Sequence, residues 1–180
     1  MEELAKNLWL LLTLVLPGMT TYGVFRLLAI LYDCKIDKAA FEKLDASALV
    51  TTCLIVAIAL VQQAFSIGIE MVLAWLCKQN RRRNWRYYQF FCNRFQMAAS
   101  GKMNEASTRV FGNFFTSLNI TIGQVLLFLY LWHLGLRFDN SALRVVTLLA
   151  LAAFVSAWFR LHNAASIIPL VRQEVASLKS

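Results

Sequence analysis

Residues 46–69, ASALVTTCLIVAIALVQQAFSIGI, decide the class of this protein. The stretch lies between Asp45 and Glu70 and contains no Lys, Arg, Asp or Glu. Its apolar residues form an almost continuous run, whereas a membrane β-strand alternates apolar and polar residues over about ten positions. A helix needs about 20 mainly apolar residues to cross a bilayer. The stretch therefore predicts a transmembrane helix.

The composition of the whole chain supports a membrane protein. Hydrophobic residues make up 59% and charged residues 16%, whereas soluble domains contain about 45–50% and about 25%. The 180 residues are the length of one domain, and small domains bury a small share of their surface. The excess apolar surface must therefore face lipid, and we expect residues 1–180 to form a single transmembrane domain.

Three further runs lack charged residues: 7–25, 110–136 and 145–159. The chain is thus predicted to be all-α, a polytopic integral membrane protein with four transmembrane helices. The predicted spans are about 7–32, 47–76, 108–135 and 142–163. The amino end MEELAKN carries two acids, which is not typical of a cleaved signal, so we expect the first helix to be retained.

The charges between the spans predict the orientation. The segment 77–107 is strongly basic, and basic loops stay on the cytoplasmic side. With four spans, both termini then also face the cytoplasm. We expect the protein to lie in the cell's inner (plasma) membrane.

The basic segment also contains aromatic residues, as in RRRNWRYYQFF. One interpretation is a topology anchor, whose basic side chains bind anionic lipid headgroups while the aromatic residues lie at the interface. The other is a site for a soluble anion or a cytoplasmic protein partner. No nucleic-acid-binding motif is present, so we expect no specific nucleic-acid binding. The candidate residues are Lys78, Arg81, Arg82, Arg83, Trp85, Arg86 and Arg94.

This segment is predicted to contain a helix of about four turns. Its aromatic residues recur at spacings of three and four, which gives an amphipathic helix with an aromatic face. Asn84 is suited to cap the amino end and Gly101 to end the helix. The helix either lies on the membrane or extends the second span.

Polar residues at membrane depth are the candidates for a pore or a polar core. They are Gln62, Gln63, Glu70, Asn113, Asn119 and Gln124. The rise of about 1.5 Å per residue places the two adjacent glutamines level with Gln124 and with Thr20–Thr21. An ionisable group inside a membrane is a functional hypothesis by default. Glu70 therefore either lines a hydrated path or binds a cation or proton, or else it is paired with Asn113 or Arg160 or lies shallow enough to reach water.

The uncharged candidates have two interpretations. Such side chains form interhelical hydrogen bonds, each contributing about 0.6–2 kcal/mol, or they line a pore where several chains assemble. Gln62 and Gln63 point about 100° apart on a helix, so they cannot both face one axis. At least one of them is therefore expected to pack against a neighbouring helix.

Glycine and proline mark the remaining special positions. Pro17–Gly18 is a candidate hinge in the first span, or a static kink filled by a neighbouring helix. Gly68, Gly112 and Gly123 suggest close helix contacts. Pro169 is expected to interrupt the helix near the carboxyl end.

No enzyme motif or metal-binding spacing occurs in the sequence. We therefore expect no enzymatic activity, no catalytic residue, no bound metal and no cofactor. The sequence favours a small channel or pore-forming membrane effector that assembles as a homo-oligomer or within a membrane complex. The alternative is a non-conducting membrane subunit or scaffold that recruits a cytoplasmic partner through its basic segment.

Overall fold

The computed structural model describes the backbone of residues 2–31, 47–80, 83–100, 105–137 and 140–177. Within these ranges the chain is all-helical and contains no strand, as predicted. Side chains are described for residues 15–31, 47–80, 83–92, 110–137 and 140–166. The helices are α1 (Glu2–Leu31), α3 (Ala48–Gln79), α4 (Trp85–Ser100), α5 (Glu105–His133) and α6 (Ser141–Ser177).

Three helices contain segments long and apolar enough to cross a membrane. These segments are Ala48–Gln79, Val110–His133 and Ser141–Ser166. In α1 the apolar segment with described side chains, Val15–Leu31, is shorter. The long apolar helices support the prediction of an integral membrane protein.

The last helix is longer than predicted. α6 begins at Ser141, close to the predicted residue 142, but it continues through Pro169 to Ser177. The prediction that Pro169 interrupts the helix is therefore wrong. Proline has no N–H and so removes one intrahelical hydrogen bond, but the loss of this one bond does not end the helix here.

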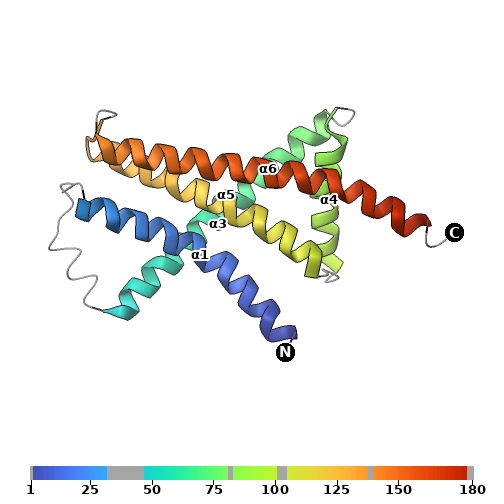
Figure 1. Ribbon diagram of the computed structural model, residues 1–180, viewed down its shortest axis with the longest axis horizontal. Helices are drawn as coiled ribbons and strands as arrows, with labels where there is room; N and C mark the ends of the chain where they lie inside the picture. Colours follow the sequence, from blue (N-terminus) through green and yellow to red (C-terminus); the bar gives the residue numbers. More distant parts are fainter. Residues whose placement is uncertain (1, 32–46, 81–82, 101–104, 138–139, 178–180) are drawn as a thin grey trace.

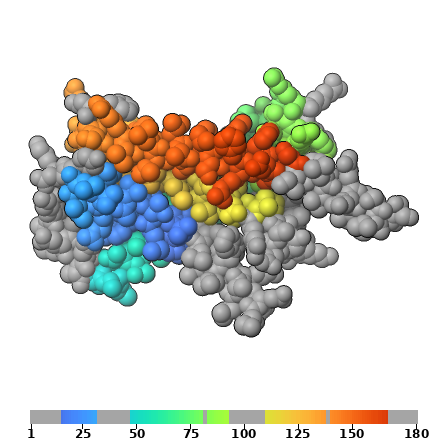
Figure 2. All heavy atoms as spheres, viewed as in Figure 1, coloured from blue at the N-terminus to red at the C-terminus, as the bar shows by residue number. Residues whose placement is uncertain are grey.

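α5 is the central helix of the bundle. It packs antiparallel to α6 along the long axis of the molecule and also contacts α1 and α3 (Figure 1). In a space-filling view α6 and α1 cover much of it, and α5 emerges between them (Figure 2). Half of its apolar segment is buried, against 11% for α3 and 22% for that of α6. A polar side chain on α5 is therefore more often enclosed by protein than one on α3 or α6.

α5 ends in a tight turn at residues 134–136. The amide of Leu136 donates to the carbonyl of Leu131 and the amide of Gly135 to that of Trp132, at 3.2 and 3.0 Å. This pair of bonds is the Schellman motif. Gly135 has a φ of +86°, a conformation that glycine adopts without steric cost. Asn140 then caps α6, because its Oδ1 accepts from the amide of Ala142 at 2.8 Å. α6 then packs along α5.

α4 is a separate helix and does not extend α3. The chain turns at Asn80–Asn84, where the amide of Asn84 donates to the carbonyl of Asn80 at 3.0 Å. α4 starts directly after Asn84, at the predicted position, and ends at Ser100. It packs against α6 and α3. The predicted stop, Gly101, lies outside the described residues.

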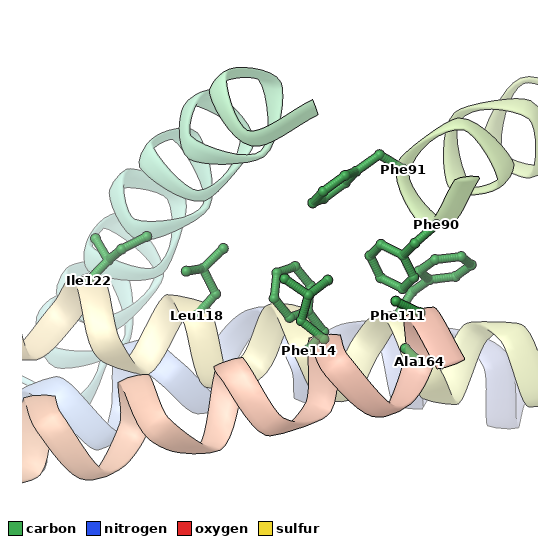
Figure 3. Close-up of a cluster of buried hydrophobic side chains, with 9 residues drawn as sticks. Phe90, Phe91, Phe111, Phe114, Leu118, Ile122 and Ala164 are labelled. Carbon is green, nitrogen blue, oxygen red and sulfur yellow. The ribbon is translucent and has the colours of Figure 1, made fainter. Parts of the chain in front are cut away.

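Phe90 and Phe91 anchor α4 to the bundle. Both are buried, and Phe90 projects toward Phe111 and Phe114 of α5, whose ring centroids lie 5.1 and 5.8 Å from its own (Figure 3). They belong to the α4-end cluster, which consists of Phe90, Phe91, Phe111, Phe114, Leu118, Ile122, Leu161, Ala164 and Ala165. A second, turn-end cluster consists of Leu28, Leu127, Leu131, Ala142, Leu143 and Val146.

Candidate polar core

α3 buries polar residues and exposes apolar ones. The residues that it buries are Ala59, Gln62, Ser66 and Glu70. Its large apolar side chains point outward, and Phe65 and Trp75 are 54% and 57% exposed. This distribution is the reverse of that in a soluble protein. It fits a helix whose outer surface is covered by lipid, because there only the inner face can hold polar groups.

The three polar residues of α3 form a row because they recur every four residues, close to one helical turn. Gln62 and Ser66 are 0% exposed and Glu70 is 1% exposed. The row follows the face of α3 that packs on α1 and α5. With their polar neighbours these side chains define the polar core, whose members are Thr21, Gln62, Ser66, Glu70, Ser117, Asn119, Thr121 and Gln124.

Two interhelical hydrogen bonds connect the polar core. Gln62 Nε2 donates to Thr21 Oγ1 of α1 at 2.8 Å. Ser66 Oγ donates to Asn119 Oδ1 of α5. The first bond confirms that Gln62 and Thr21 lie at the same depth, as the helix rise predicts. Hydrogen bonds of this kind hold membrane helices together, each contributing about 0.6–2 kcal/mol.

Gly123 permits the close approach of three helices. A Cβ added at this position would overlap Thr21 Oγ1 and Gln62 Nε2. The expected close contact at Gly123 is thus confirmed. At Gly68 that expectation is wrong, because a Cβ there would meet nothing within 4 Å. Gly68 lies two residues beyond Ser66 and so points to the opposite side of α3.

α6 reaches the polar core through serine. Ser117 Oγ and Ser156 Oγ are 3.4 Å apart, and Thr121 Oγ1 donates to the carbonyl of Ser117 at 2.8 Å. Arg160 Nε donates to Ser156 Oγ at 3.3 Å. These contacts connect the exposed Arg160 with the interior of the bundle. The first and third are long for hydrogen bonds between such groups, so they contribute little to stability.

Gln124 is the most unusual member of the core. It is 1% exposed, and neither Nε2 nor Oε1 has a hydrogen-bond partner among the described residues. Gln62 Oε1 is in the same situation. A buried polar group without a partner costs about 1–3 kcal/mol. The fold therefore retains polar atoms here at a cost to its stability.

The predicted polar candidates divide into two groups. Gln62, Glu70, Asn119 and Gln124 are brought together in the core, whereas Gln63 is half-buried and Asn113 is exposed. Ser66, Ser117 and Thr121 were not among the candidates. Their signal was the spacing: Ser66 stands four residues from both Gln62 and Glu70, and Ser117 and Thr121 stand seven and three residues before Gln124.

The basic candidates lie where α3 ends and α4 begins. Lys78, Arg83, Trp85 and Arg86 are all exposed. Arg81 and Arg82 lie outside the described residues, as does the side chain of Arg94. This corner of the molecule is therefore accessible to an anionic headgroup or to a partner.

Tyr87 holds the first turn of α4 against α6. Its hydroxyl is 2.9 Å from His162 Nδ1, and its ring centroid lies 6.4 Å from that of Trp158. The exposed basic corner is thus tied to α6 near the end of its apolar segment.

The predicted hinge lies at the crossing of α1 and α3. Pro17 and Gly18 are both buried. A Cβ added at Gly18 would lie 2.5 Å from the carbonyl oxygen of Ile55 and 2.9 Å from Cβ of Ala59. Gly18 therefore lets the two backbones approach closely, as small residues do between membrane helices.

No protein-family model, curated protein or solved structure matches this chain.

Proposed function

We propose that the protein is a small membrane channel or pore-forming effector whose conduction path runs through the polar core of the bundle. In this proposal α1 also crosses the membrane, which gives four spans. Both termini and α4 lie in the cytoplasm, because the exposed Lys78, Arg83 and Arg86 gather at one end of the bundle. The membrane is the cell's inner (plasma) membrane.

One observation carries the proposal: the face that α3 buries is lined by Gln62, Ser66 and Glu70. Burying a carboxyl group in a bilayer costs several kcal/mol by most measures, and such groups mark ion and proton pathways. A purely structural helix would be more stable with apolar residues packed at these positions. The retained cost favours conduction over simple packing.

The described conformation corresponds to a closed channel. The α4-end cluster and the turn-end cluster are both fully apolar. Hydrophobic constrictions stop ions because water leaves them. Conduction in this proposal begins when one or both clusters open, and homo-oligomerisation or a larger membrane complex supports the open form.

The mass of the purified particle followed by ion flux in liposomes tests the proposal. We expect the protein to pass ions and Glu70→Gln to change conduction, since this variant removes the charge and preserves the shape of the side chain. A particle that stays electrically silent at every potential applied would exclude the channel.

The exposed basic corner favours a second candidate, a non-conducting scaffold. Lys78, Arg83, Trp85 and Arg86 present cationic and aromatic groups, which suit anionic lipid headgroups or an acidic cytoplasmic protein. Neutralising Arg83 and Arg86 then abolishes recruitment of the partner, whereas Glu70→Gln leaves recruitment intact. The channel proposal predicts that Glu70→Gln changes ion flux, whereas neutralising Arg83 and Arg86 leaves it intact.

A further inference from the structure

We propose that the basic corner between α3 and α4 is a binding site for an anionic phospholipid, whose headgroup is held by Lys78, Arg83 and Arg86. This inference goes beyond the proposed channel, because lipid binding at the corner requires no conduction. It gives the corner one occupant, an anionic lipid of the surrounding bilayer.

The turn after α3 brings the three cationic side chains to one place. Lys78 lies in the last turn of α3, and the amide of Arg83 donates to the carbonyl of Asn80 at 3.1 Å. α4 starts two residues after Arg83, with Arg86 in its first turn. All three cationic side chains are exposed. The corner therefore presents cations from two helices and from the turn between them.

This part of the sequence contains no acidic side chain that could neutralise the corner. Residues 71–104 include no Asp or Glu. Among the described side chains the one carboxyl group is that of Glu70, which is buried. Each Lys or Arg near a membrane surface strengthens the binding of anionic lipid about fivefold. An anionic headgroup thus supplies the counter-charge that this segment lacks.

Three tryptophans place the corner at the level of the lipid headgroups. Trp75, Trp85 and Trp158 belong to three different helices, and their exposed fractions lie between 42% and 57%. The ring centroid of Tyr87 lies 6.4 Å from that of Trp158, which brings the indole of α6 next to the first turn of α4. Tryptophan concentrates at the membrane–water interface, because its ring is apolar and its N–H is polar. The cations therefore lie where the bilayer has its phosphates.

Apolar surface for the acyl chains adjoins the cations. The exposed Val72 and Leu76 lie four residues apart, on one face of α3, just before Lys78. α4 does not continue this surface, because it crosses α6 instead (Figure 1). A phospholipid can contact both parts, with its phosphate on the cations and its chains on α3. A soluble anion would use the cations alone, so the combination favours a lipid.

Native mass spectrometry of the full-length protein in detergent tests the site. Phosphatidylglycerol or phosphatidylcholine is added at known concentrations, and the bound lipid is counted. We expect phosphatidylglycerol to bind at least about tenfold more tightly, because its headgroup carries a net negative charge that several cations attract. Equal affinities for the two lipids would overturn the proposal.

Single arginine variants test the location of the site. Arg83→Gln and Arg86→Gln should each weaken the binding of phosphatidylglycerol about fivefold and leave that of phosphatidylcholine unchanged. Arg137→Gln is the matched control, because it removes an exposed arginine beyond the other end of α5 and should retain the wild-type affinity. Since all three side chains are exposed, the Tm in detergent should stay at that of the wild type. An equal loss in the control, or no loss in either corner variant, would overturn the proposal.

Two competitors distinguish the lipid from other sources of negative charge. Inorganic phosphate or an oligoglutamate peptide is added at the same concentration as phosphatidylglycerol. We expect neither to displace the lipid, because neither contacts the apolar surface of α3. Displacement by phosphate would assign the corner to a soluble anion, and displacement by the peptide would assign it to an acidic protein. Either result would overturn the proposal.

Discussion

Gln62 and Gln63 are neighbours on α3, yet Gln62 is fully buried and bonded to Thr21, whereas Gln63 lies half-buried outside that contact. The difference follows from the turn of about 100° between successive helical residues. Because the two side chains face different surroundings, they distinguish a conduction path inside one chain, which Gln62 would line, from a pore at an axis between chains, which Gln63 would line. Only Gln62 belongs to the polar core.

A pair of leucine variants tests where the path runs. We expect Gln62→Leu to lower ion flux at least about tenfold, because an apolar side chain would then interrupt the polar row. Gln63→Leu should leave the flux within about twofold. Flux is measured in liposomes at equal protein content. The reverse result would place the path at an axis between chains.

Gly123 should tolerate no side chain. Gly123→Ala forces Cβ into Thr21 and Gln62, and such overpacking costs about 1–3 kcal/mol. Gly68→Ala is the matched control, because it meets open space and replaces glycine in a helix, which gains up to about 1 kcal/mol. Thermal unfolding in detergent compares the two. Equal Tm values would show that α5 moves aside without cost.

The crossing of α1 and α3 gives a second pair. Gly18→Ala places Cβ 2.5 Å from the carbonyl oxygen of Ile55, and a backbone atom cannot rotate away. We expect a loss of about 1–3 kcal/mol. Gly23→Ala, in the same helix but with nothing within 4 Å, should be neutral or stabilising. A stable Gly18→Ala protein would instead favour a mobile hinge at Pro17–Gly18.

The hydroxyl of Tyr87 should hold α4 in place. Tyr87→Phe removes its contact with His162 and keeps the ring against Trp158. The expected cost is about 0.5–1.5 kcal/mol, seen as faster hydrogen exchange in the first turns of α4. The control repeats the change in a His162→Leu background, where Tyr87→Phe should have no further effect. An additional loss there would assign the hydroxyl to another partner.

The long apolar helices were predictable because length and apolar composition are properties of the local sequence. Depth was predictable too, since the constant helix rise put Gln62 level with Thr21. The orientation of α3 about its own axis was not predictable, because it depends on contacts with other helices. Gly123 and Gly18 set that rotation, and it decides that Gln62 faces inward and Gly68 outward. The passage of α6 through Pro169 was missed for a related reason: a proline weakens a helix without fixing where it ends.

The polar row of α3 has a consequence for biosynthesis. Asn119, which accepts the bond from Ser66, follows it by 53 residues. At about 5–20 residues per second, the ribosome needs about 3–10 s to make that interval. During this time α3 has α1 as its partner, through Thr21 and the Gly18 crossing. In the proposed four-span arrangement the α1–α3 pair therefore forms first, and it shelters Ser66 and Glu70 until α5 is made.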